Sequence, residues 1–106
     1  MRVDIDFSIF TSVPSAEGVI SGNIEVDALP RAGEKISFFN APNESIFPSR
    51  ADFDPLLKVE DVIHSASGRG AALQLQDVTL PNRQSVAEVA AYLEQGFRLF
   101  FDPISE

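Results

Sequence analysis

A single histidine, His64, is the side chain in this sequence best suited to move a proton near neutral pH, because an unperturbed imidazole titrates in that range. Glu60 and Asp61 are its acidic neighbours, but residues four apart on an extended strand lie well separated. The chain has no cysteine and no Gly-x-Ser-x-Gly motif to mark a nucleophile. We therefore predict no catalytic residue and no enzymatic activity. A ligand-binding or enzymatic barrel that uses His64 is kept as an alternative.

Two pairs of aspartates, Asp4 with Asp6 and Asp52 with Asp54, offer carboxylates to a hard cation. Alternation along a strand places Asp4 and Asp6 on the same face. The residues after Asp52 lack the glycine and the final glutamate of a calcium-binding loop. One histidine and no cysteine are also a poor ligand set for a transition metal. We predict neither a metal site nor a cofactor.

The acidic residues point instead to a docking surface for a basic protein. The chain has 16 Asp and Glu against 8 Lys and Arg, a formal net charge of -8. If the first two strands pair antiparallel, their outward faces bring together four carboxylates opposed only by Arg2: Asp4, Asp6, Glu25 and Asp27. Such a cluster attracts lysine and arginine of another protein. The alternative is that it protects a sheet edge against aggregation.

The segment from Asn40 to Pro55 is a second candidate contact surface. Its prolines, at positions 42, 48 and 55, exclude a long helix or a central strand. Phe47 and Phe53 make the segment apolar, so they either cover the core or anchor a partner. We include both phenylalanines, with Asp52 and Asp54, in the predicted partner-binding set.

The negative charge argues against two other classes of partner. Binding nucleic acid through its phosphates needs a basic patch, and an anionic membrane surface also selects basic proteins. The apolar runs fall far short of the roughly 20 residues that span a bilayer. The N-terminus starts in strand-like alternation, without the apolar region of a signal peptide. We expect a cytoplasmic protein that binds neither nucleic acid nor membrane.

The elements that must position these residues are mostly strands, in a single domain of 106 residues. Residues 2–9 and 20–28 alternate apolar and polar side chains, as half-buried strands do. Lys35 to Asn40 predicts a third strand, with apolar residues on both faces. Leu57 to Leu80 predicts a β-hairpin, because two alternating arms flank a turn that contains glycine.

Both arms of this hairpin change phase, which predicts a curved sheet. Val59 is followed by Val62, and Leu75 by Val78, a spacing of three where alternation requires two. Such a slip needs a bulge, which bends the strand and increases its twist. Matched slips in neighbouring arms favour a strongly curled sheet or a small β-barrel. The alternative is that each arm ends near its slip.

One helix is predicted from Asn82 to Gln95. Ser85 and Glu88 fit a capping box at its start, and Gly96 fits a left-handed cap at its end. Phe97 to Phe101 alternates again and predicts a final strand. The element order is therefore β-β-β-loop-β-β-α-β, an α+β fold whose mostly antiparallel sheet carries one C-terminal helix.

These observations favour a non-enzymatic, acidic protein-binding module. Its sharper form is an inhibitor or immunity-type protein that covers the nucleic-acid cleft of a basic partner, such as a nuclease toxin. The alternative is a structural subunit of a homo-oligomer or of a larger particle. Phe39, Phe100 and Tyr92 lie on the less expected faces of their elements, which indicates a partly apolar surface and allows a homodimer.

Overall fold

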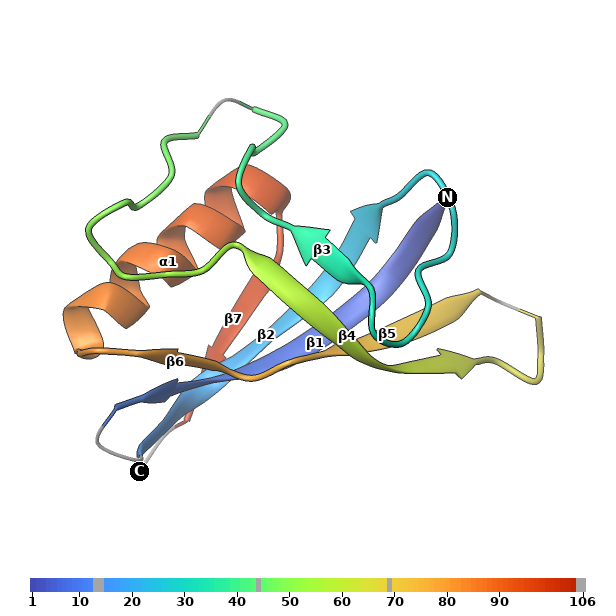
Figure 1. Cartoon of the computed structure of the whole chain (residues 1–106), viewed down its shortest axis with the longest axis horizontal. Helices are drawn as coiled ribbons and strands as arrows, with labels where there is room; N and C mark the ends of the chain where they lie inside the picture. The colour runs from blue at the N-terminus through green and yellow to red at the C-terminus, as the bar shows by residue number, and fades with distance from the viewer. Residues whose placement is uncertain (13–14, 44, 69, 105–106) are drawn as a thin grey trace.

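The computed structural model describes residues 1–12, 15–43, 45–68 and 70–104, and within them seven strands form one mixed sheet beside one helix (Figure 1). The strands are β1 (Arg2–Thr11), β2 (Ser15–Glu25), β3 (Lys35–Ser37), β4 (Leu56–His64), β5 (Ala71–Leu75), β6 (Val78–Leu80) and β7 (Phe100–Pro103). The helix, α1, runs from Arg83 to Phe97. The predicted α+β class with a C-terminal helix is confirmed.

The strands follow the order β3-β4-β5-β1-β2-β7, and β6 pairs with β1 beyond the end of β5. The pairs of β1 with β5 and with β6 are parallel, and the remaining described pairs are antiparallel. The path begins at β3 and ends at β7 without closing. The prediction of a strongly curled sheet or a small barrel is therefore not supported.

The two phase slips of the hairpin explain why the sheet does not curl as predicted. The slip in β4 is a bulge, as predicted: Val59 pairs with Leu75 and Asp61 with Gln74, so Glu60 is the extra residue. The slip after Leu75 is an interruption between two strands. The chain leaves β5 and returns as β6, which resumes parallel pairing farther along β1. The second slip thus extends the parallel pairing along β1 instead of bending a continuous strand.

The helix is where the sequence places it, but its caps differ from those predicted. The N-cap is Asn82, whose side chain accepts a hydrogen bond from the Ser85 backbone N–H at 2.9 Å. Asparagine is as good a cap as serine, and Ser85 itself is buried in the first turn. The left-handed residue at the other end is Arg98, with φ 57°. Gly96 lies inside the helix and is buried.

The core lies between α1 and one face of the sheet. The inward side chains of β1 and β2 alternate with polar ones, as predicted. The largest fully buried side chains are Phe38, Ile9, Ile20, Leu57, Leu73, Leu80, Leu93, Val3, Val59 and Val89. The helix contacts β1, β2, β6 and β7, so the opposite face of these strands is left without a helix.

The segment of residues 38–55, here named the β3–β4 loop, runs along α1 (Figure 1). Tyr92 of the helix shares its one hydroxyl hydrogen between the backbone carbonyls of Phe38 and Phe39. The Phe47 ring contacts the rings of Phe39, Phe53 and Tyr92. Tyr92 is only 4% exposed, so its predicted place on an apolar surface is wrong. It faces inward because it holds this loop.

Candidate protein-binding face

The sheet face opposite α1, here named the open face, is built by strand register. Residues paired across a ladder point to the same side, and Asp4 and Asp6 alternate with buried side chains of β1. Asp6 pairs with Ser21 of β2 and with Gln74 of β5, which in turn pairs with Asp61 of β4. The same reasoning gives the whole open face: Arg2, Asp4, Asp6, Ser8, Val19, Ser21, Asn23, Glu25, Asp61, Ile63, Ala72, Gln74, Phe100 and Asp102.

Two adjoining hollows lie on this face, with volumes of about 550 and 300 Å³. They share Asp6 and Gln74 in their walls. Asp4 lines one hollow, and Glu60 and Asp77 line the other. Neither wall contains a described lysine or arginine. The centre of the open face therefore carries several carboxylates with no cation among them.

Two of the four carboxylates predicted to cluster on β1 and β2 do not join the acidic centre: Glu25 lies at the end of the open face and is paired with cations, and Asp27 lies beyond β2. Glu25 is opposite Arg2 in the ladder, and its carboxylate accepts from the N-terminal ammonium at 3.0 Å and from Arg2 at 3.4 Å. The hydrogen bond from the ammonium group lowers the pKa of Glu25 below its ordinary value, and the nearby Arg2 adds to this effect. Asp27 is exposed beyond the end of β2. Only Asp4, whose partner is Asn23, stays beside Asp6.

The predicted contact residues of the β3–β4 loop do not join the open face, since this loop packs on α1. Phe53 is only 6% exposed and belongs to the core, and Phe47 is half-buried. The Asp54 carboxylate accepts from the Leu56 backbone N–H at 3.0 Å, which ties it to the start of β4. Asp52 is exposed and has φ 59°. The loop and the open face are thus separate candidate surfaces.

Sequence reasoning missed several members of the acidic centre. Glu60 and Asp61 turn outward because of the bulge, and Asp77 accepts a hydrogen bond from the Ser8 backbone N–H at 3.3 Å. The spacing of three in each hairpin arm signals both irregularities. The strand neighbours, which decide what lies beside Asp6, leave no such signal in one sequence.

His64 does not form a catalytic arrangement with its acidic neighbours. It is exposed at the end of β4, opposite Ala71, and its imidazole has no hydrogen-bond or ion-pair partner among the described residues. Across the described ranges, no group of three or more His, Cys, Asp or Glu side chains is arranged to hold a metal ion.

The fold and the open face define a small α+β domain with a helix on one side of a mixed sheet and carboxylates on the other. Comparison of the chain with protein-family models, with curated proteins and with solved structures finds no match. In the part of the chain that the structure describes, no helix is long and apolar enough to cross a membrane.

Proposed function

We propose that this protein is a non-enzymatic binding module whose open face docks a basic surface of another protein. The observation that supports the proposal best is the pair of adjoining hollows lined by Asp4, Asp6, Glu60 and Asp77 without a described cation. Complementary charge raises the rate of encounter and selects against acidic partners. A net charge of -8 adds long-range attraction of the same sign.

Apolar side chains on the same face can supply the binding free energy that exposed carboxylates do not. Surface ion pairs contribute little free energy, so affinity requires buried apolar area. Phe100 is 67% exposed on β7, and Ile63 is 49% exposed on β4. Each strand lies two positions from β1, which separates the two side chains by about 19 Å across the sheet. An α-helix, about 10–12 Å wide with its side chains, fits between them over Asp4 and Asp6.

In its sharper form, the partner is a nuclease-type toxin whose cationic nucleic-acid cleft the open face covers. A cleft that binds phosphates is lined with lysine and arginine, which are the side chains that the acidic hollows select. This version is supported by charge complementarity and by the small size of the domain.

The experiment compares two double variants with the same change of charge. Asp4→Asn with Asp6→Asn neutralises the open face, and Asp52→Asn with Asp54→Asn neutralises the β3–β4 loop. We expect the wild-type protein to retain a basic partner from source-cell extract at low salt and to lose most of it at about 0.5 M salt, where charges are screened over a few ångströms. Only the first double variant should lose the partner at low salt.

Three results would contradict the proposal. One is retention of acidic partners alone. Another is equal retention by wild type and the Asp4/Asp6 variant. The third is loss in the Asp52/Asp54 variant only, which would move the binding surface to the loop.

A homo-oligomer is the second candidate, supported by Phe100 on the edge strand β7 and by Phe39, 53% exposed. Exposed aromatic side chains often mark contacts between subunits. Light scattering across a concentration series tests it, because a homodimer doubles the apparent mass and Phe100→Ser should restore the monomer. A constant monomer mass at high concentration would exclude this candidate.

A further inference from the structure

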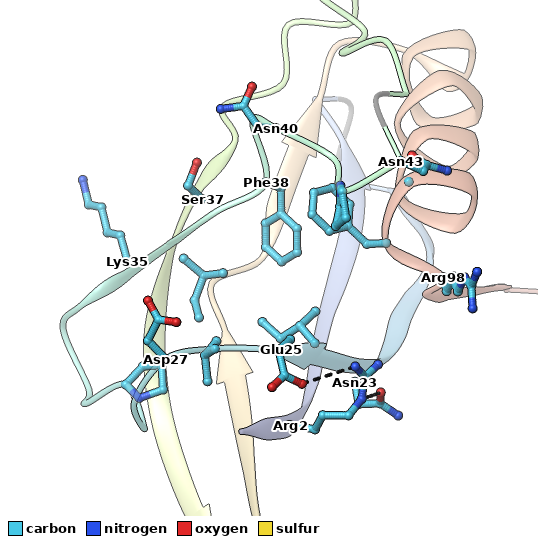
Figure 2. Close-up of a pocket in the computed structure, with 17 residues that line it drawn as sticks. Arg2, Asn23, Glu25, Asp27, Lys35, Ser37, Phe38, Asn40, Asn43 and Arg98 are labelled. Atoms are coloured by element: carbon cyan, nitrogen blue, oxygen red, sulfur yellow. Dashed lines mark hydrogen bonds and ion pairs between the residues drawn. The ribbon is translucent and has the colours of Figure 1, made fainter.

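A larger hollow of about 820 Å³ lies away from the centre of the open face, between the end of β2, strand β3 and the C-terminal end of α1 (Figure 2). We name it the end hollow. Its apolar lining includes Phe38, Phe97 and Ile36. The rings of Phe38 and Phe97 meet edge to face, 5.1 Å apart between centroids. Phe38 is buried, whereas Phe97 and Ile36 are half-buried, so these two side chains offer the apolar surface that a flat ligand group can contact.

The rim of the end hollow has three cationic side chains and two carboxylates, whereas the chain as a whole is acidic. Arg2, Lys35 and Arg98 line it, with Glu25 and Asp27. Glu25 is neutralised, because one carboxylate oxygen accepts from the N-terminal ammonium and the other from Arg2. In Figure 2, Arg2 and Arg98 border the lower and right sides, whereas Asp27 lies at the left and Lys35 points away. The side occupied by the arginines therefore favours an anion.

Arg98 makes this side of the end hollow suitable for an anion. Its backbone has φ 57° and ψ 34°, the left-handed conformation that glycine adopts without strain. Its backbone N–H closes the helix by donating to the Leu93 carbonyl. Its guanidinium is exposed and has no hydrogen-bond or ion-pair partner among the described residues. A strained position thus holds a free planar cation at the rim of the end hollow.

The end of a helix carries a partial negative charge that opposes an anion, but two of its carbonyls here, those of Leu93 and Gln95, already accept hydrogen bonds. The Leu93 carbonyl accepts from the backbone N–H groups of Arg98 and Leu99. The Gln95 carbonyl accepts from the Asn43 side-chain amide at 2.6 Å. Asn43 belongs to the β3–β4 loop, so the loop both caps the helix and forms one wall of the hollow.

We propose that the end hollow binds a small organic anion with an apolar body. Its carboxylate or phosphate group pairs with the fork of Arg98, assisted by Arg2 and by the free amide N–H of Asn23, whose oxygen already accepts from Arg2 at 2.8 Å. The body rests on the half-buried side chains of Phe97 and Ile36, with the buried Phe38 ring behind them. Asp4 and Asp6 take no part, so the site does not depend on the acidic centre of the proposed docking face, although Arg2 and Asn23 lie at the end of that face.

Four probes test the assignment by amide NMR of the whole chain. The two ligands are 4-phenylbutyrate and phenyl phosphate, which distinguish a carboxylate from a phosphate. The controls are 4-phenylbutanamide, which has the body without the charge, and inorganic phosphate, which has the charge without the body. We expect saturable shifts at Phe38, Phe97 and Arg98 with one of the ligands, at a Kd on the order of 1 mM for a molecule of this size.

Matched variants test whether Arg98 is the cation that pairs with the anionic group of the ligand. Arg98→Gln should weaken binding about fivefold or more, as expected when a charged hydrogen-bond donor is lost. Arg50→Gln, which removes one exposed charge outside the hollow, should leave the Kd unchanged, as should Asp4→Asn with Asp6→Asn. The proposal is overturned by any of the following: no saturable shift with either anion at about 20 mM, equal binding of the neutral amide or of inorganic phosphate, or an unchanged Kd in Arg98→Gln.

Discussion

Replacing Gly96 with alanine tests whether the β3–β4 loop is fixed on the helix. Gly96 is buried near the end of α1. A Cβ atom built there lies 2.7 Å from the Cβ of Ala41 and 3.5 Å from the Cβ of Ser45, both in the loop. The first distance is well inside ordinary contact between carbon atoms. The methyl group therefore enters space that the loop occupies.

Two opposing terms decide the effect on stability. Alanine favours the helix over glycine by up to about 1 kcal/mol, and less near a helix end. Overpacking a buried contact costs about 1–3 kcal/mol. The loop is held by Tyr92 and by Asn43, so it moves away only if those hydrogen bonds weaken. We therefore expect Gly96→Ala to lower the free energy of unfolding by about 1–2 kcal/mol.

Urea unfolding followed by circular dichroism measures this change, and two further variants separate its terms. Ala87→Gly, at an exposed helix position, reports the propensity term alone. Ala41→Gly removes the methyl group that the new side chain meets. In the double variant of Gly96→Ala with Ala41→Gly, the clash is absent, so we expect a favourable coupling of about 1–2 kcal/mol.

A Gly96→Ala protein at least as stable as wild type, with an additive cycle, would refute the reasoning. It would mean that the loop yields to a methyl group at little cost. The wall that this loop contributes to the end hollow would then be adjustable, and the ring contacts of Phe47 would not hold it.

Three other outcomes are expected. Burial raises the pKa of Tyr92, the sole tyrosine, above its ordinary 10.0, so tyrosinate absorbance of the folded protein should develop above pH 10. Because the unfolded chain ionises first, the stability that this residue contributes should be complete below pH 10 and fall as pH rises through the raised pKa. A folded-state pKa at or below 10 would contradict the burial. Arg98→Gly should raise the free energy of unfolding by about 0.5–1 kcal/mol, since the relief of left-handed strain exceeds the backbone entropy that glycine adds to the unfolded chain. The same variant should lose anion binding, and a less stable variant would assign Arg98 a structural role. The pKa of Glu25 is lowered, so its contribution is present above about pH 4.5 and is lost as pH falls through the lowered pKa; a carboxyl NMR titration at the ordinary value would show that the ammonium contact does not persist.

Side-chain periodicity was sufficient to predict the elements but not their neighbours. Alternation in β1 and β2 and the apolar stripe of α1 report which side of each element is buried. They do not report which strand lies beside β1, and parallel pairing with β5 requires contacts distant in sequence. The helix caps show a similar limit: Asn82 and Ser85 are both good caps, and packing buries one of them.

The candidate site was predictable to the same extent. Alternation correctly placed Asp4 and Asp6 together on the outer side of β1. The register, which shifts between Ile9 and Phe10, set Arg2 opposite Glu25 and thereby neutralised one member of the predicted cluster. The sequence pattern did not predict the left-handed cap at Arg98, because the glycine two residues earlier is the ordinary marker of such a cap.

The short border strands of the sheet have a consequence for how another chain can attach. Strands β3 and β6 each have three residues, and β7 has four and ends in a proline. A main chain that adds to a sheet by β-augmentation needs a longer run of free backbone groups, and short edges that contain proline discourage it. The part of β4 that extends beyond β3 is a further border, and it begins at the bulge of Glu60, which also discourages pairing. We therefore expect a partner to recognise side chains and not the backbone. Single substitutions and ionic strength should then control its affinity, and the domain should resist edge-to-edge polymerisation at high concentration.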